Sequence, residues 1–230
     1  IINTLAKDCD YENRRQHSIE FNKKAEAEGS DKRLGLALTP VKFGISFTVQ
    51  HLNQAGALVH IYTDGTIQIN HGGTEMGQGL YIKIAQIVAN EFDVDLDTVK
   101  ATATRTDKVP NTSPTAASSG TDINGKAAQN ACITIRERIV EFAAKHFEVA
   151  SDDIKFERNH VHIGNKETIT FAEMVLLAYQ HRISLSSTGY YKTPKIFYDR
   201  SKAWGRPFFY FALGASCSEV EIDTLTGEYK

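Results

Sequence analysis

A glycine-rich stretch follows the strongest hairpin signal of the chain, and the two together limit what the chain can fold into. Asp64-Gly65 separates two short runs of alternating apolar and polar residues, 57–62 and 66–70. This pattern predicts a β-hairpin with a type I′ turn, because Asp-Gly accepts the positive φ angles of that turn. The second run leads directly into His-Gly-Gly-Thr-Glu-Met-Gly-Gln-Gly, residues 71–79, which precedes a helical pattern. We therefore expect strand, turn, strand, loop and helix in direct succession.

A second stretch of small and hydroxylated residues, 111–120, also precedes a helical pattern. A turn that opens into a helix presents unpaired N–H groups and the positive end of the helix dipole to an anion. Neither stretch has the Lys-Ser/Thr ending of a P-loop or the spacing of a dinucleotide-binding fold. Two such stretches favour a large anionic ligand held mainly by backbone. The alternative is two ordinary strand-to-helix connections.

The rest of the chain mixes helical and strand patterns without strict βαβ alternation. Apolar spacing predicts helices at about 10–27, 80–92 and 128–142, and a capping box predicts a further helix from 170 to about 179. Strand patterns occur at 36–49, 98–104, 154–163, 185–192 and 208–223, with 193–206 as a polar irregular loop. This mixture predicts an α+β fold of mixed sheets with packed helices.

Composition narrows the classes of function. The 230 residues are 41% hydrophobic with a net charge of −2, and no basic stripe interleaves with aromatic residues, so we expect no nucleic-acid partner. No apolar run reaches the length of a membrane span and the first residues lack a signal-peptide layout, so we expect no membrane partner. Three widely spaced cysteines, Cys9, Cys132 and Cys217, predict a cytoplasmic protein without a disulfide framework.

Few residues have the setting of a catalytic group. The sequence has no G-x-S-x-G nucleophile elbow, and Cys132 falls within an apolar helical stripe. Glu75, in the first stretch, can act as a general base or can stabilise a helix dipole, and the structural role is favoured. Gln78 offers a donor and an acceptor without charge, which suits a ligand with mixed polar groups.

Two phenylalanines, Phe43 and Phe47, lie four residues apart around Gly44, with Ser46 and Thr48 beside the second. On a regular strand both rings point to the same face. The pair can be ordinary core packing. The alternative is an aromatic slot for a flat ring, with a hydroxyl at its rim.

Three motifs carry a family resemblance. They are Lys-Phe-Gly-Ile-Ser-Phe-Thr at 42–48 with the following Asn-Gln-Ala-Gly-Ala-Leu, the glycine-rich stretch 71–79, and Val-Pro-Asn-Thr-Ser-Pro-Thr-Ala-Ala-Ser at 109–118. They resemble the molybdenum-binding portion of the xanthine dehydrogenase/oxidase family, and the likeness extends from about 13 to 227. Aldehyde oxidases match the glycine-rich stretch equally well, whereas 42–48 and 113–117 favour the purine enzymes.

The resemblance implies a substrate wall in this chain. Phe43 and Phe47 match two phenylalanines that hold the purine, and Thr48, beside Ser46, matches a residue that contacts it. The family converts hypoxanthine and xanthine to urate in purine catabolism, and passes electrons through two [2Fe–2S] clusters and FAD to NAD. An aldehyde oxidase-type molybdenum hydroxylase and a metal-free phosphate- or nucleotide-binding module are the alternatives.

The resemblance also implies part of a molybdopterin cradle. The loop that hydrogen-bonds the cofactor matches Met76, Gly77 and Gln78. Ala117 matches a position whose backbone approaches molybdenum, where a larger side chain would collide with the metal's ligands. The residues that flank it in this cradle are Thr115, Ala116 and Ser118.

The same resemblance predicts that the chain is a fragment of the molybdopterin-binding domain and is inactive alone. The glutamate that activates the family reaction lies beyond residue 230, so no catalytic residue is expected here. Three cysteines are too few for two [2Fe–2S] clusters. We expect a division into 1–56, with the lead-in helix and substrate wall, and 57–230, with the cofactor cradle. The expected partners are a purine and the remaining domains of a homo-oligomeric enzyme.

Overall fold

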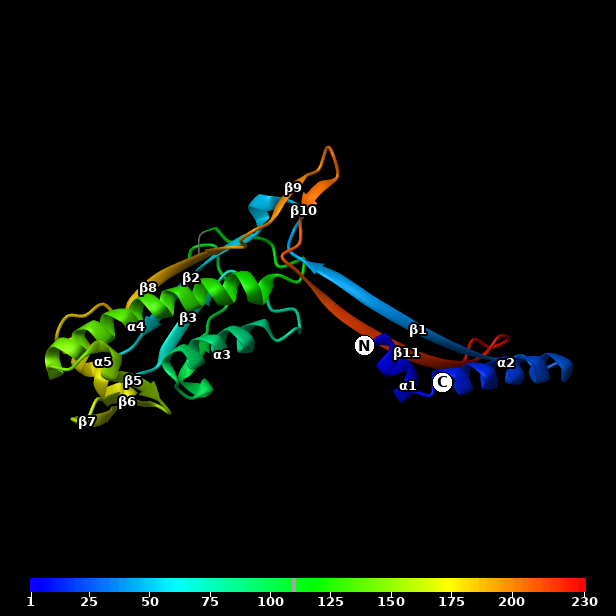
Figure 1. The fold of residues 1–230 in the computed structure, drawn as a ribbon, viewed down its shortest axis with the longest axis horizontal. Coiled ribbons are helices and arrows are strands. Elements are labelled where there is room, and N and C mark those ends of the chain that lie inside the picture. Colours follow the sequence, from blue (N-terminus) through cyan, green and yellow to red (C-terminus); the bar gives the residue numbers. More distant parts are fainter. Residues whose placement is uncertain (109–110) are drawn as a thin grey trace. The chain divides into compact units, whose positions relative to one another are not determined.

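The computed structural model describes residues 1–108 and 111–230 (Figure 1). Val109 and Pro110, the first residues of the third motif, lie outside the described residues. The chain divides into two compact units. We call Ile1–Gly44 with Tyr210–Lys230 the ribbon unit and Ile45–Phe209 the core unit. This division differs from the boundary expected after residue 56, because the last strand returns to the unit of the first.

The ribbon unit pairs two long strands and adds two helices. Its elements are α1 (Ile2–Asp8), α2 (Tyr11–Ala27), β1 (Lys32–Ile45) and β11 (Tyr210–Asp223), with β1 paired to β11. The predicted helix at 10–27 is confirmed as α2, whereas α1 was not predicted. The buried Ser18 hydroxyl of α2 donates to the Leu34 carbonyl at 2.7 Å, and this bond fixes the helix against the start of β1.

The core unit is built on a four-stranded sheet in the order β4–β3–β2–β8. Its strands are β2 (Gln54–Ile61), β3 (Ile67–His71), β4 (Val99–Ala101) and β8 (Ser186–Lys192). β2 pairs antiparallel with β3 and β8, and β3 pairs parallel with β4. The predicted hairpin of 57–62 and 66–70 is confirmed. β4 is shorter than the strand expected at 98–104 and ends at Ala101.

Two helices, α3 (Leu80–Phe92) and α4 (Lys126–Phe147), lie side by side against this sheet (Figure 1). α3 buries the predicted apolar stripe, including Leu80, Ile84 and Val88, in the main hydrophobic cluster. α4 approaches β8 so closely that a Cβ at Gly189 would lie 2.0 Å from the Ala127 carbonyl oxygen. The sheet and the helix pair together fix the positions of the loops that connect them.

A second, three-stranded sheet and one helix complete the core unit. The elements are β5 (Ile154–Glu157), β6 (His160–Ile163), β7 (Glu167–Thr170) and α5 (Phe171–Gln180), and the single-turn helices are η1 (Gln50–Leu52), η2 (Leu96–Thr98) and η4 (Ser151–Asp153). The predicted capping box is present, because Thr170 Oγ1 accepts the Glu173 N–H at 3.2 Å and Glu173 accepts the Thr170 N–H at 2.8 Å. The α+β assignment, with mixed sheets and packed helices, is confirmed.

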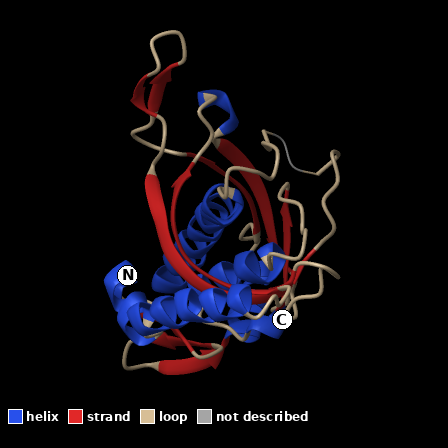
Figure 2. Cartoon of the chain, turned by 90° about the vertical axis from the view of Figure 1, so that its right-hand side faces the viewer, coloured by secondary structure: helices blue, strands red, loops and turns tan. Residues whose placement is uncertain are grey.

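Two local predictions were wrong. The first concerns the hairpin turn, which is not type I′. The Gly65 N–H donates to the Tyr62 carbonyl, and among residues 62–66 only Gly65 has a positive φ, of 88°. The connection therefore has three residues, with Gly65 in the left-handed position that this longer loop requires. The second error is the expected irregular loop at 193–206, which contains a short hairpin of β9 (Phe197–Asp199) and β10 (Trp204–Arg206). Figure 2 shows this hairpin as a ribbon of its own.

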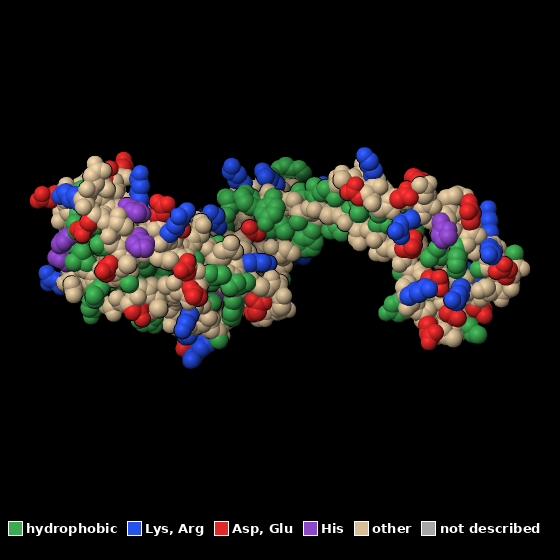
Figure 3. All heavy atoms as spheres, turned by 90° about the horizontal axis from the view of Figure 1, so that it is seen from below, with side chains coloured by type: hydrophobic (Ala, Val, Ile, Leu, Met, Phe, Trp, Pro, Cys, Tyr) green, Lys and Arg blue, Asp and Glu red, His purple; other side chains and the backbone are tan. Residues whose placement is uncertain are grey.

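The surface carries both signs of charge. Figure 3 shows Lys and Arg side chains interspersed with Asp and Glu on the visible face. No helix within the described residues has both the length and the apolar character needed to cross a bilayer.

Candidate functional site

The first loop (71–79) and the second loop (111–120) meet at one cavity of about 580 Å³ in the core unit. The Thr74 N–H donates to Thr115 Oγ1 at 2.8 Å and joins the loops directly. The cavity lies within the range of about 300–1,000 Å³ typical of small-molecule sites. Its walls include every residue of the predicted cradle except Gly77, together with two residues of α3, the last residue of the second loop and the residue that follows it. They are Met76, Gln78, Leu80, Lys83, Thr115, Ala116, Ala117, Ser118, Gly120 and Thr121.

Two glycines of the first loop lie in crowded surroundings, and one of them faces the second loop. A Cβ on Gly72 would lie 2.0 Å from Thr112 Cγ2, and one on Gly73 would lie 2.5 Å from Leu80 Cδ2. Contacts this short do not occur between real side chains and their neighbours, so an alanine at Gly72 would push Thr112 of the second loop out of place, whereas one at Gly73 would displace the end of the Leu80 side chain.

The Glu75 carboxylate occupies the N-terminus of α3. It accepts the N–H groups of Gly77 at 2.9 Å, Gly79 at 3.0 Å and Tyr81 at 3.1 Å. These bonds, the Tyr81 bond most of all, hold the pKa of Glu75 below its ordinary value. The structural role favoured for Glu75 is confirmed. The expectation that this helix terminus is open to an external anion was wrong, because the protein's own carboxylate fills it.

Gln78 folds back over the first loop. Its Oε1 accepts the Met76 N–H at 2.6 Å, and its Nε2 donates to the Thr74 carbonyl at 2.9 Å. An amide has two donor hydrogens and two acceptor lone pairs, so one of each remains for a ligand. Lys83 Nζ donates to the Gln78 carbonyl at 2.8 Å and supports the same turn from α3.

The second loop contains two consecutive left-handed residues, Ala117 with φ 55° and Ser118 with φ 53°. This conformation is uncommon for residues with a Cβ, and small side chains tolerate it best. The Ser119 N–H and hydroxyl both donate to the Ala116 carbonyl, at 3.3 and 3.1 Å, and close the turn. A π-helix, η3 (Thr121–Gly125), follows and leads into α4. No pattern in the sequence predicted this π-helix.

The segment that contains Phe47 touches the second loop. The Ser46 N–H donates to the Ala117 carbonyl at 3.4 Å, and Ser46 is buried with φ 122°. Asn53, 2% exposed, accepts the Phe47 N–H at 2.7 Å and donates to the Phe47 carbonyl at 2.9 Å. Phe47 is half-buried and Thr48 is exposed. Sequence reasoning missed Asn53, although asparagine before a strand is a common turn former.

The strand that contains Phe43 ends before Phe47. β1 ends at Ile45, and the positive φ of Ser46 interrupts the strand, so the two rings do not share the face of one regular strand. Phe43 belongs to the ribbon unit and is 46% exposed there. Its predicted contact with a purine stays a prediction.

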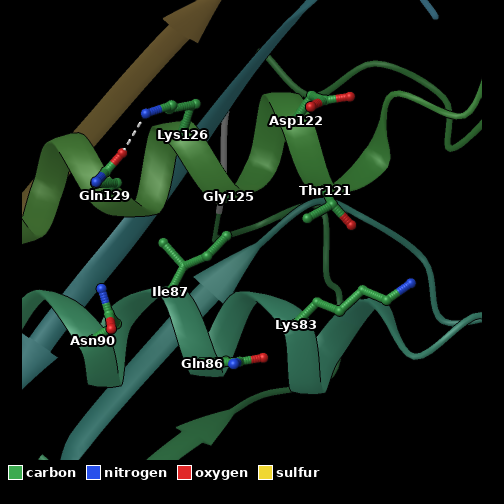
Figure 4. A pocket seen from close by; sticks show the side chains of 9 residues that line it. All are labelled: Lys83, Gln86, Ile87, Asn90, Thr121, Asp122, Gly125, Lys126 and Gln129. Carbon is green, nitrogen blue, oxygen red and sulfur yellow. Dashed lines mark hydrogen bonds between the residues drawn. The ribbon is translucent and has the colours of Figure 1, made fainter. Parts of the chain in front are cut away.

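A second cavity, of about 400 Å³, lies between α3 and the η3–α4 segment (Figure 4). It shares Lys83 and Thr121 with the first cavity. Its polar wall is partly engaged internally, because Lys126 Nζ donates to Gln129 Oε1 at 2.7 Å. Within residues 1–108 and 111–230, no group of three His, Cys, Asp or Glu side chains is arranged to hold a metal ion.

Comparison with known proteins identifies the family. The family model described as Molybdopterin cofactor-binding domain matches residues 4–230. Xanthine dehydrogenase/oxidase of Felis catus is 45% identical over 220 residues, and xanthine dehydrogenase of Oryza sativa subsp. japonica is 43% identical over 225. These matches cover 96% and 98% of the chain but 15% of each relative, so the chain spans about 15% of the length of these relatives.

Solved structures show the same fold. Quinoline 2-oxidoreductase from Pseudomonas putida 86 has a TM-score of 0.77 at 23% identity, and the Cu,Mo-CO dehydrogenase has a TM-score of 0.79 at 19%. Each match covers 99% of this chain and 29% of the other. The resemblance seen in the sequence is confirmed: the chain belongs to the molybdopterin cofactor-binding domain family, as a fragment similar to one region of the xanthine dehydrogenases.

Proposed function

We propose that this chain supplies part of the molybdopterin cradle and one wall of the purine site of an enzyme that oxidises hypoxanthine and xanthine to urate. The observation that carries the proposal is the meeting of the two loops at one cavity, joined by the 2.8 Å bond from the Thr74 N–H to Thr115. The names of the relatives support the purine substrate.

The cavity fits an organic cofactor with mixed polar groups and a phosphate. Its wall offers the spare donor and acceptor of Gln78, the hydroxyls of Thr115 and Ser118, and the Lys83 ammonium. Gly77 faces open space, because no atom lies within 4 Å of the position its Cβ would take. When bound, molybdopterin would supply a molybdenum centre for the two-electron oxidation of a ring carbon.

The residues of this chain would hold the cofactor and orient the substrate. Gln78 would bind polar groups of the pterin, and the methyl group of Ala117 leaves room close to the backbone. Phe47 would contact the flat purine ring, with Thr48 at its rim, because aromatic rings stack well and a hydroxyl can donate or accept. Asn53 would keep Phe47 in place through the two backbone bonds described above.

The rest of the reaction is assigned to other parts of the enzyme. The catalytic glutamate, the FAD, the [2Fe–2S] clusters and the NAD site would lie in the remaining domains of a cytoplasmic homo-oligomer. The isolated chain would then be inactive. A metal-free phosphate-binding module is less well supported, because Glu75 already fills the helix terminus that a phosphate would use at the first loop.

Two alanine variants of the full-length enzyme test the proposal, each with a control of the same residue type. Gln78→Ala removes two side-chain bonds worth about 1 kcal/mol each, so we expect roughly tenfold or greater loss of retained molybdenum. Gln86→Ala, an exposed change on α3, leaves the molybdenum content unchanged.

Phe47→Ala is expected to lower kcat/KM for xanthine by about 10–100-fold, the change that 1.4–2.8 kcal/mol of aromatic contact produces. Phe197→Ala, at an exposed aromatic in β9, is the control. Full molybdenum in Gln78→Ala together with wild-type turnover in Phe47→Ala would refute the assignment. A wild-type enzyme without stoichiometric molybdenum would favour the metal-free alternative.

A further inference from the structure

His71 is the residue at which β3 ends and the first loop begins. It is the last residue of β3, is 1% exposed, and meets the ring of Tyr81 edge to face with centroids 5.0 Å apart. In the sequence, His71 is the first residue of the glycine-rich stretch and belongs to no catalytic or metal-binding pattern. Because His71 is where the strand ends, a hydrogen bond from its side chain can orient the backbone of the residues that follow.

The hydrogen bond made by His71 fixes the position of its proton. Nδ1 accepts the Gly73 N–H at 3.1 Å, so the hydrogen of the neutral ring lies on Nε2. Burial lowers the pKa of His71 to about 4, against a smaller opposing effect of Glu75, which keeps the ring neutral near pH 7. The ring therefore serves as an acceptor toward the loop.

The bond to Gly73 begins a chain of contacts that reaches the second loop. The Gly73 carbonyl accepts from Thr104 Oγ1 at 2.8 Å, so both polar backbone groups of Gly73 are held. The next N–H along the chain, that of Thr74, is the donor to Thr115 that joins the loops. The orientation of Gly73 thus determines where the Thr74 N–H points.

Buried polar atoms without partners gather around the same two glycines. Within residues 1–108 and 111–230, these side-chain atoms are His71 Nε2, Thr112 Oγ1, Asn124 Oδ1 and Arg136 Nε. The first three belong to residues that crowd Gly72 or Gly73, where an added Cβ would contact them. An apolar ring would fill the site of His71 without an unpaired N–H. Space filling alone therefore does not account for a histidine here.

We propose that His71 is a positioning residue for the cofactor cradle, which acts through the acceptor Nδ1 on Gly73 and so aligns the Thr74 N–H with Thr115. Asn124 gives the second loop a matching anchor, because its Nδ2 donates to the Gly120 carbonyl at 2.9 Å from within the π-helix. The inference rests on the proposed cradle, and it adds a residue that does not line the cavity.

Two variants of the full-length enzyme separate the acceptor from the ring. His71→Asn places an oxygen where Nδ1 stood and keeps the acceptor. His71→Phe keeps an aromatic ring, somewhat larger than imidazole, against Tyr81 but removes the acceptor. Amide hydrogen exchange of residues 72–79, measured with and without cofactor, reports the loop, and exchange of residues 154–163 in β5 and β6 reports the fold.

In His71→Phe we expect exchange at 72–79 to be about tenfold faster or more, because the loss of one buried hydrogen bond changes an equilibrium by roughly tenfold. We expect the molybdenum content of the same variant to fall about threefold or more. His71→Asn stays within about twofold of wild type in both measurements. Equal effects of the two variants, wild-type exchange in His71→Phe, or general unfolding that accelerates exchange at 154–163 in both would overturn the proposal and leave His71 a packing residue. Exchange in the cofactor-free enzyme tests His71 independently of what the cavity binds, whereas the molybdenum content of the wild type tests the proposed function.

Discussion

The first loop is held mainly by the hydrogen bonds of two of its own side chains, whereas the second combines fewer such bonds with two consecutive left-handed residues. In the first loop, Glu75 and Gln78 satisfy five backbone groups between Thr74 and Tyr81. In the second, Ala117 and Ser118 adopt left-handed angles with no glycine at either position. One wall of the cavity is therefore rigid before a ligand binds, while the other brings its backbone close to the ligand because its side chains are small.

Ala117→Val is expected to have the largest effect, because it attacks the feature that defines the second loop. A β-branched residue at φ 55° is strained by about 1–2 kcal/mol, and its methyl groups enter the cavity. We expect a molybdenum content below about a tenth of wild type, the change that 1.4 kcal/mol produces. Ala117→Gly, which accepts this φ without strain, retains the metal. Equal retention by both variants would show that side-chain size does not matter in the second loop.

Replacing one glycine with alanine in each loop tests whether the backbone conformation at that position requires glycine. Gly77 in the first loop has φ +96° with open space around it, so Gly77→Ala is strained by backbone alone, by about 1 kcal/mol. Gly120 in the second has helical angles and ordinary contacts at 3.5 Å, so Gly120→Ala is neutral or stabilising by about 0.4–1 kcal/mol. Amide exchange at each loop measures the difference. The reverse order would contradict the assigned conformations.

Glu75→Gln should have a smaller effect that depends on pH. The folded pKa of Glu75 lies below its ordinary value of 4.5, so the carboxylate contributes stability above that value and loses it as the pH falls through the folded pKa. The wild type should therefore melt higher than the variant at pH 7, and the gap should narrow in acid. Glu137→Gln, an exposed change on α4, is the control. A gap that is constant with pH would mean that Glu75 does not stabilise the loop as a charged group.

The elements with clear periodicity were predictable. The spacing of Leu80, Ile84 and Val88 gave α3, and the capping box at Thr170 gave the start of α5. The two loops could be recognised because glycine and small residues are concentrated there, and the structure shows which glycines are sterically required. Glu75 was predictable as a helix-stabilising carboxylate because it lies just before the helix.

Other features depend on tertiary contacts that no local pattern records. β1 and β11 pair across most of the sequence, so the division into units could not be read from neighbouring residues. The β9–β10 hairpin lacks apolar alternation and places Gly205 at φ +136°. The roles of His71 and Asn53 follow from hydrogen bonds to backbone in loops, which depend on how the chain folds back on itself.

The pairing of β1 with β11 has a consequence for biosynthesis. The core unit is one uninterrupted segment, Ile45–Phe209, so it can fold on the ribosome while the C-terminal strand is still inside the exit tunnel. β1 is synthesised before the core unit, whereas its partner β11 is synthesised after it. Until β11 emerges, the edge of β1 that it pairs with has unpaired N–H and C=O groups, which can pair with another strand.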